Sequence, residues 1–311
     1  MAPRPPLSVH VIGNLQLDVL ASPVDSMPSP GGDRVIDRIA VRTAGAAGNV
    51  SLALAGLGVR HRLFGAVGDD DAGRWLATEL ERLGLAADLL VVPDQATGIS
   101  IALEAPGRER AFLTAHGVLS GYGVQHLPPD ATAADLVLVT GYFSLPGLRG
   151  DGTRQLLERA RAAGATTFFD TGWDPDEWRG DGAREVLDLL PLVDVFLPNE
   201  PEALALTGAS TVADALPLLR KDCPGWVIVK RGPEGLLAAG PDGELLDLDA
   251  PAVEAIDTTG AGDSLAAGVL ADLCAGHDMA TALRTGVRVA STVVGRTSHR
   301  RYPTRSELLP V

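Results

Sequence analysis

The chain has 311 residues, of which 46% are hydrophobic, and a formal net charge of −14 at pH 7. Nucleic-acid-binding proteins normally present a basic face, so the negative net charge argues against that class. A negative net charge is still compatible with a small anionic ligand, because backbone N–H groups and a metal can bind it locally. The two cysteines, Cys223 and Cys274, form no C-x-x-C pair, so we expect neither a disulfide framework nor a thiolate zinc site. With no signal-peptide pattern and no run of about 18 apolar residues, the sequence predicts a cytoplasmic protein without a membrane span.

Short apolar runs alternate with helical patterns along most of the chain. The runs read as strands, and they include "LSVHVIGN" (7–14), "HRLFGAVGDD" (61–70), "ADLVLVTG" (134–141), "ATTFFDTG" (165–172), "DVFLPNE" (194–200) and "GWVIVKRG" (225–232). Such alternation predicts one α/β domain over residues 1–311, with a doubly wound, mostly parallel sheet and helices on both faces. Ligands of these sheets bind beyond the carboxyl ends of the strands, where Asp170, Asn199 and Lys230 are expected.

Two segments, at about 16–43 and 97–117, break this alternation, because each reads as strand, turn, strand with no helix between. They can form a small separate sheet that lies over the site as a lid, or they can be edge hairpins of the main sheet. The pattern alone leaves both interpretations open.

The stretch "AIDTTGAGDSLAAGVL" (255–270) sets a glycine-rich turn before a predicted helix. Glycines there allow backbone N–H groups to converge on an anion, and a carboxylate beside the anion can take a proton from an attacking alcohol. Asp263 would be that carboxylate, beside the turn Gly260–Ala261–Gly262. The other interpretation makes the glycines a tight turn and Asp263 only an N-cap of the helix.

Five stretches in chain order resemble motifs of the ribokinase-like (PfkB-type) carbohydrate kinases. They are "VIGNLQLDVL" (11–20), "AGAAGNVSLALAGLG" (44–58), "LPNEPEA" (197–203), "VKRGPEG" (229–235) and "DTTGAGDSLAAG" (257–268). The resemblance implies an ATP-dependent kinase that uses Mg²⁺ to phosphorylate a primary hydroxyl of a small sugar or related polyol. It also implies that the two strand–turn–strand segments form a lid, and that two lids pack together in a homodimer.

The resemblance assigns a role to each motif residue. It makes Asp263 the catalytic base, and Gly260, Ala261 and Gly262 the anion hole. Substrate would bind at Asp18, Gly45 and Asn49. Nucleotide would bind at Asn199, Lys230, Gly232 and Gly235. Glu202 would hold Mg²⁺ through water, and Asp257 would help to bind a potassium ion.

Simpler structural roles stay open for several of these residues. Asp18 and Lys230 can be exposed charges at strand ends, and Asn49 can cap its own helix. Glu202 can be a helix N-terminal charge, and Asp257 can hydrogen-bond its own turn.

The sequence departs from the family pattern in places that bear on specificity. Ala44-Gly45 replaces a Gly-Gly pair, Ala46 stands where ribokinases often have lysine, and "TGYFS" (140–144) replaces a strand end that carries glutamate in ribokinases. The late "GRTSHRRYP" (295–303) lacks a Pro-Gly-Ala turn, which leaves the adenine pocket and the potassium site open. A nucleoside kinase of the same fold and a non-catalytic sugar- or nucleotide-sensing protein remain alternatives.

Arg34, Arg38 and Arg42 are spaced by four in a strand-like run, so we expect their side chains on one face. On the outside of the lid they would be a solvated stripe, which we favour together with a neutral acceptor. On the cleft side they would favour a phosphorylated sugar, because a phosphate needs fixed cations.

Overall fold

The computed structural model describes residues 6–104, 111–297 and 301–308. Its main sheet has the strand order β13-β12-β11-β10-β9-β8-β1-β4-β5. The strands from β11 to β5 are parallel, and β12 and β13 add antiparallel pairs at one edge. The bounds are β1 (Val9–Gly13), β4 (Arg62–Gly68), β5 (Ala86–Val92), β8 (Leu136–Thr140), β9 (Thr166–Asp170), β10 (Val195–Phe196), β11 (Trp226–Lys230), β12 (Leu236–Ala239) and β13 (Leu245–Leu248).

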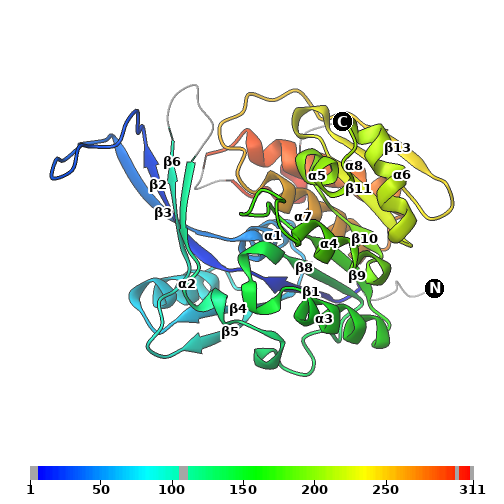
Figure 1. Cartoon of the computed structure of the whole chain (residues 1–311), viewed down its shortest axis with the longest axis horizontal. Coiled ribbons are helices and arrows are strands. Elements are labelled where there is room, and N and C mark those ends of the chain that lie inside the picture. Colours follow the sequence, from blue (N-terminus) through cyan, green and yellow to red (C-terminus); the bar gives the residue numbers. More distant parts are fainter. Residues whose placement is uncertain (1–5, 105–110, 298–300, 309–311) are drawn as a thin grey trace.

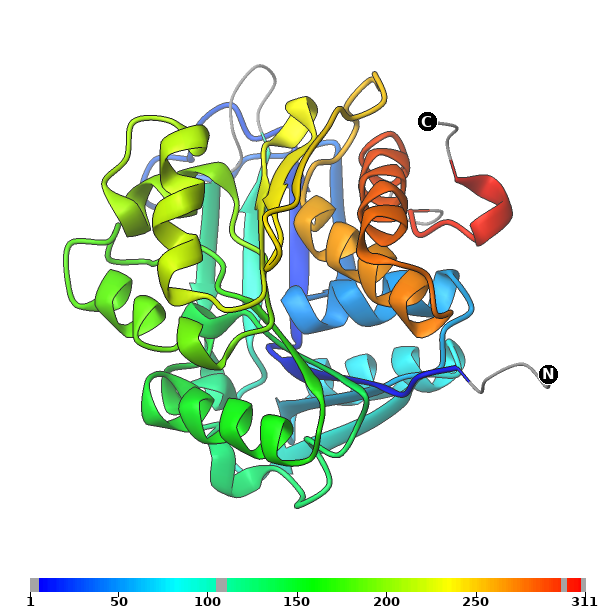
Figure 2. The same cartoon turned by 90° about the vertical axis from the view of Figure 1, so that its right-hand side faces the viewer.

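Helices cover both faces of this sheet (Figures 1 and 2). One apolar core lies between the sheet and α1 (Ala46–Gly56), α2 (Asp71–Arg82), α7 (Ala261–Cys274) and α8 (Met279–Val294). The other lies between the sheet and α3 (Asp151–Ala162), α4 (Gly182–Leu187), α5 (Glu200–Thr207) and α6 (Val212–Asp222). Strands covered on both faces read as continuous apolar runs, as in β8, where every residue is buried. The predicted α/β class is confirmed.

Short 3-10 turns connect these elements: η1 (Gly117–Ser120), η2 (Val124–His126), η3 (Tyr142–Ser144), η4 (Pro146–Leu148), η5 (Leu190–Leu192), η6 (Gly232–Glu234) and η8 (Arg305–Glu307). Both cysteines, Cys223 and Cys274, are buried and free. Among the described residues, no helix combines the length and the apolar character that a membrane crossing requires.

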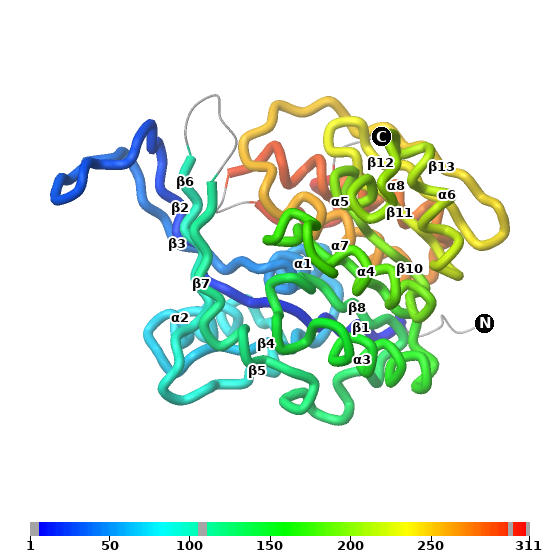
Figure 3. Tube along the Cα trace, in the orientation of Figure 1, coloured from blue at the N-terminus to red at the C-terminus, as the bar shows by residue number. Residues whose placement is uncertain are grey.

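The two strand–turn–strand segments form a second sheet rather than edge hairpins of the main one. This lid sheet has the order β3-β2-β6-β7, with β2 (Gln16–Ser22), β3 (Arg38–Ala44), β6 (Ile99–Leu103) and β7 (Ala111–Ala115). It stands to one side of the main sheet (Figures 1 and 3).

The register of the lid sheet separates a polar face from an apolar one. Asp18 pairs with Arg42 and with Ser100, so these side chains share one face. Val19 pairs with Val41 and Ile101, which therefore share the other face.

Candidate active site

The glycine turn of 255–270 leads directly into α7. Gly260 is the N-cap residue, with a left-handed φ of 72°, and a Cβ at this position would lie 3.0 Å from the Asn49 side-chain nitrogen. Asp263 lies in the first turn of the helix and is not its cap, so the N-cap interpretation is wrong. The Ala261 N–H donates to the Thr258 carbonyl oxygen at 3.2 Å, which closes the turn. The next N–H groups, of Gly262 and Asp263, point out of the helix end, where anions are favoured.

The Asp263 carboxylate is held by Asn49 from α1. Asn49 Nδ2 donates to Asp263 Oδ2 at 2.8 Å. Desolvation by the surrounding protein and the negative charge of Asp170 raise the pKa of Asp263 to about 7, although the Asn49 hydrogen bond and Lys230 act in the opposite direction. The group is therefore poised to exchange a proton near neutral pH.

Lys230, at the end of β11, is largely enclosed, with a side chain 12% exposed, and is not an exposed strand-end charge. Its Nζ donates to Asp170 Oδ2 at 2.7 Å, and both side chains are largely enclosed. Burial alone would lower the pKa of Lys230, but the carboxylates of Asp170 and Glu202 outweigh it and raise the pKa. Lys230 therefore stays a fixed cation beside the first turn of α7, where a Cβ at Gly262 would lie 3.1 Å from its Nζ.

Asn199 and Glu202 form a reciprocal capping box at the start of α5. Glu202 Oε2 accepts the Asn199 backbone N–H at 2.9 Å, and Oε1 accepts Asn199 Nδ2 at 2.7 Å. The Asn199 side-chain oxygen accepts the Glu202 N–H at 2.9 Å. Burial raises the pKa of Glu202 to about 7, with Lys230 opposing and Asp170 reinforcing the shift. Glu202 thus lies in the first turn of α5, where its alternative role as a helix N-terminal charge placed it, and it also closes the capping box.

This donor set fits Mg²⁺ only through water. Both Glu202 oxygens already accept hydrogen bonds, and Glu202 is 2% exposed. Within the described ranges, no group of three or more His, Cys, Asp or Glu side chains could hold a metal ion. Mg²⁺ commonly keeps several waters and takes further ligands from substrate phosphates, so this site needs few protein ligands.

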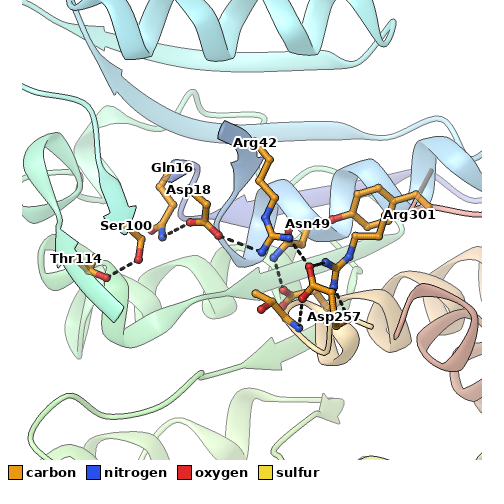
Figure 4. A network of polar contacts seen from close by, with 11 residues as sticks. Gln16, Asp18, Arg42, Asn49, Ser100, Thr114, Asp257 and Arg301 are labelled. Atoms are coloured by element: carbon orange, nitrogen blue, oxygen red, sulfur yellow. Dashed lines mark hydrogen bonds and ion pairs between the residues drawn. The ribbon is translucent and has the colours of Figure 1, made fainter. Parts of the chain in front are cut away.

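The lid sheet contributes a polar face to the site (Figure 4). Asp18 is 3% exposed, so the interpretation as a solvated strand-end charge is wrong. Its Oδ1 accepts Gln16 Nε2 at 3.3 Å, and its Oδ2 lies 3.4 Å from Arg42 Nη2. Burial raises the pKa of Asp18, against the opposing charge of Arg42. Ser100 and Thr114, whose hydroxyls lie 2.8 Å apart, share this face, and the sequence motifs did not indicate them.

Arg42 lies in the site, which corrects the expectation of a solvated arginine stripe. Its side chain is 14% exposed, and its Nη1 donates to Asp257 Oδ2 at 2.7 Å. Arg38 shares this face of β3 but is exposed, and Arg34 precedes the strand. The spacing of four therefore predicted the shared face of Arg38 and Arg42 but not which face it is.

Asp257 accepts hydrogen bonds on both carboxylate oxygens. Oδ1 accepts the Thr259 N–H at 3.0 Å, so the turn-stabilising interpretation holds. Oδ2 accepts Arg42 Nη1 and also Arg301 Nη1, and Arg301 Nη2 donates to the Asp257 carbonyl oxygen at 3.3 Å. The arrangement does not fit a potassium ion, because guanidinium groups already contact Oδ2 and the carbonyl oxygen of Asp257, and Oδ1 accepts the Thr259 N–H.

Tyr302 orients the amide that holds Asp263. Its hydroxyl donates to Asn49 Oδ1 at 3.0 Å, so the Asn49 nitrogen is directed at Asp263. Burial raises the pKa of Tyr302, which keeps the hydroxyl a donor. The motifs missed Arg301 and Tyr302; their only signal was the departure of 295–303 from the family pattern, and 298–300 lie outside the described residues.

Gly45 is the N-cap residue of α1, with φ 82°, and a Cβ there would lie 2.4 Å from the Asn14 carbonyl oxygen. Asn14, which the motifs did not single out, accepts the Ala46 N–H at 3.0 Å. Gly232 and Gly235 lie in the turn between β11 and β12. The structure thus gathers Asp18, Gly45, Asn49, Asp257 and Asp263 around one site, with Lys230 beside α7.

The comparisons with known proteins agree with this geometry. The model of the pfkB family carbohydrate kinases matches residues 7–305. An ATP-dependent ribose-1-phosphate kinase from Halopiger xanaduensis is 30% identical over 294 residues, with 94% of this chain and 93% of that protein covered. Aminoimidazole riboside kinase from Salmonella typhimurium is 29% identical, with 84% and 79% covered.

Solved structures show the same fold. Adenosine kinase from Sinorhizobium meliloti has a TM-score of 0.81 at 26% identity, with 93% of this chain and 94% of that chain covered. A putative Ribokinase II in complex with ATP and Mg²⁺ from E. coli has a TM-score of 0.84 at 22% identity, with 96% and 97% covered. The chain therefore belongs to the pfkB family of carbohydrate kinases, and it is an ATP-dependent kinase of sugars or nucleosides.

Proposed function

We propose that this kinase transfers the γ-phosphoryl group of ATP to a primary hydroxyl of a small sugar or related polyol, with Asp263 as the general base. The observation that carries the proposal is the Asp263 carboxylate, held by Asn49 at the N-terminus of α7 with its pKa raised to about 7. A carboxylate in this state accepts a proton near neutral pH, beside a helix end that favours the transferring phosphoryl group.

Phosphoryl transfer at this site exchanges one phosphorus–oxygen bond for another and moves one proton. The acceptor oxygen forms a bond to the γ-phosphorus as the bond from that phosphorus to the ADP oxygen breaks. The hydroxyl proton passes to Asp263, which releases it to solvent after the phosphorylated product leaves. Of the predicted anion hole, the Ala261 N–H is already used by the Thr258 carbonyl oxygen, so the N–H groups of Gly262 and of the following Asp263 would face the phosphoryl oxygens. Lys230 would add a positive charge beside them.

The nucleotide is proposed to lie over α5 and the turn after β11. Gly232 and Gly235 would let the backbone approach it there, and Asn199 and Glu202 would orient waters of Mg²⁺. Mg²⁺, when bound, neutralises charge that develops between the β- and γ-phosphates. The E. coli neighbour in complex with ATP and Mg²⁺ supports this donor through its shared fold.

The charges at the acceptor end favour a neutral substrate. Arg42 and Arg301 are matched there by the carboxylates of Asp18 and Asp257, so no formal positive charge is left over for a phosphate. Each Asp18 oxygen has one long contact, to Gln16 or to Arg42, and retains acceptor capacity for one of two adjacent hydroxyls.

Two other acceptors are supported by specific observations. A phosphorylated sugar is supported by Arg42 on the lid-sheet face that carries Asp18, by exposed Arg38 on the same face, and by the relative named a ribose-1-phosphate kinase. A nucleoside is supported by the riboside and adenosine kinase relatives.

A phosphorylation screen with Mg-ATP tests these assignments. It should include matched pairs, such as fructose against fructose 6-phosphate and ribose against ribose 1-phosphate, together with nucleosides. We expect the highest kcat/KM on a neutral sugar or polyol. A clear preference for the phosphorylated member of a pair would transfer the assignment to sugar phosphates, and turnover on no acceptor would contradict the kinase assignment.

The lid sheet is proposed to pack against a second copy of the chain. Its face away from Asp18 carries Val41, Ile101 and Leu113 in one cross-strand row, with exposed fractions of 50%, 36% and 57%. An uncovered apolar sheet face is unfavourable, and a two-fold axis would let one copy cover the other. Light scattering should show a dimer at micromolar concentrations, and a monomer would contradict the proposal.

A further inference from the structure

Arg301 contacts the Asp257 carboxylate and the Asp257 carbonyl oxygen, the two kinds of oxygen that a monovalent cation would use. Such a cation binds through carboxylate and backbone carbonyl oxygens. Arg301 bonds both kinds of oxygen on one residue, because Nη1 contacts the Asp257 carboxylate and Nη2 donates to the Asp257 carbonyl oxygen at 3.3 Å. Figure 4 shows the two side chains meeting directly.

The surrounding charge disfavours a further cation. The Asp257 Oδ2 atom that contacts Arg301 also accepts Arg42 Nη1 at 2.7 Å. Arg301 is 3% exposed and Asp257 is 6% exposed, so little solvent screens these charges. An ion at this oxygen would lie against two guanidinium groups in a poorly screened environment, where like charges repel strongly.

The same contact stabilises the turn that carries the anion pocket. Asp257 Oδ1 accepts the Thr259 N–H at 3.0 Å, and the Thr258 carbonyl accepts the Ala261 N–H at 3.2 Å. Asp257 thus connects Arg301 to the backbone just before α7, whose first turn contains Asp263.

From this geometry we infer that Arg301 is a built-in replacement for a monovalent cation, so that phosphoryl transfer by this chain, as proposed above, does not depend on potassium. Arg301 is a positioning residue: it fixes Asp257 and the turn, and it contacts no reacting atom.

Cation titration of the wild-type enzyme is the first test. Rates of ADP release with an acceptor found in the screen are measured in tetramethylammonium, sodium and potassium chloride at constant ionic strength. We expect rates within about two-fold of one another, since the site already holds its cation. Saturable activation by potassium of about five-fold or more over tetramethylammonium would overturn the inference.

Melting temperatures give a readout that needs no acceptor, and so separate this inference from the proposed function. Potassium should move the melting temperature of the wild-type protein no more than tetramethylammonium does. A potassium-specific rise would overturn the inference even if no acceptor were found. Turnover on no acceptor, with equal melting in both salts, would contradict only the proposed function.

The variant Arg301→Met tests the residue itself. It should lose about ten-fold or more in rate in tetramethylammonium and regain part of it in potassium, because the Asp257 oxygens become available. Arg82→Met removes an exposed guanidinium paired with Glu79 and should retain wild-type rates in every salt. Wild-type rates for Arg301→Met in tetramethylammonium would overturn the role. If Arg301→Met does not fold, the variant Arg301→Lys is measured in its place. Because lysine keeps the positive charge, its rates in tetramethylammonium and in potassium should be equal, and activation by potassium would overturn the role.

Discussion

The raised pKa of Asp263 predicts how activity depends on pH. Desolvation and the charge of Asp170 raise it to about 7, and only the ionised carboxylate can accept a proton. We therefore expect kcat to rise with pH between about 5.5 and 8 and then to level off, as the general base ionises. Steady-state rates across this range are the measurement. A kcat that is constant across this pH range, or a pH profile with its midpoint near the ordinary pKa of aspartate, would contradict the raised pKa of Asp263.

Tyr302 acts on Asp263 through Asn49. Tyr302→Phe removes the hydroxyl that donates to Asn49 Oδ1 at 3.0 Å, so the amide is no longer fixed. The Asn49 hydrogen bond lowers the pKa of Asp263, and its weakening should move the pH profile upward and reduce kcat about ten-fold. Tyr142→Phe is the matched control, because its hydroxyl contacts Glu185 and Gly150. It should leave the profile unmoved, and equal profiles for both variants would show that Tyr302 has no positioning role.

At the scale of elements, α7 depends on the turn before it. Gly260→Ala forces an alanine into φ 72° and places its Cβ against Asn49. Gly276→Ala also creates positive-φ strain, but nothing lies within 4 Å of its Cβ. Both variants should lose about 1 kcal/mol of unfolding free energy, while only Gly260→Ala should lose kcat. Denaturant melts and kinetics compare them, and equal kcat losses would show that the clash is unimportant.

The elements themselves were largely predictable from the sequence. Buried parallel strands such as β8 appear as continuous apolar runs, and the glycine turn appears before the helix it starts. The orientation of β3 was not predictable, because alternation tells that Arg38 and Arg42 share a face but not which sheet face meets the site. Arg301 was not predictable either, because it lies in the irregular stretch after α8 and contacts Asp257, which is 44 residues earlier in the chain.

At the scale of the whole molecule, the acidic chain concentrates enclosed cations around one site. Lys230, Arg42 and Arg301 each contact a buried carboxylate there, although the net charge is −14. Lys230 can stabilise the transferring phosphoryl group locally even when the overall field is negative, whereas Asp18 and Asp257 match the charges of Arg42 and Arg301. The net charge therefore argued against a nucleic-acid partner, but it did not indicate the charge of the site.

The exposed apolar row of the lid sheet predicts that the proposed dimer forms through this sheet. Leu113→Glu places a charge on the apolar row of the lid, where burial of an unpaired carboxylate is costly, so we expect the dimer to dissociate. Leu245→Glu, in edge strand β13, changes a residue of similar exposure outside the lid and should leave the mass unchanged. Light scattering compares the two variants. If only Leu245→Glu dissociated the dimer, the interface would lie at the β13 edge of the main sheet and not at the lid sheet.

Asp263 is the proposed general base, and Asp263→Asn removes its basicity while keeping the shape of the side chain. The folded pKa of about 7 exceeds the ordinary 3.8, so the ionised group costs stability as pH rises through this interval. At pH 8 the free energy of unfolding of the variant should therefore exceed that of the wild type, by on the order of 1 kcal/mol. A melting temperature above that of the wild type would show that the variant is folded.

The decisive measurement is kcat of this folded variant on the acceptor from the screen. We expect a loss of about 10³-fold or more with ATP binding retained, because base and alignment are lost together. Turnover close to that of the wild type would contradict the assignment of Asp263 as the base.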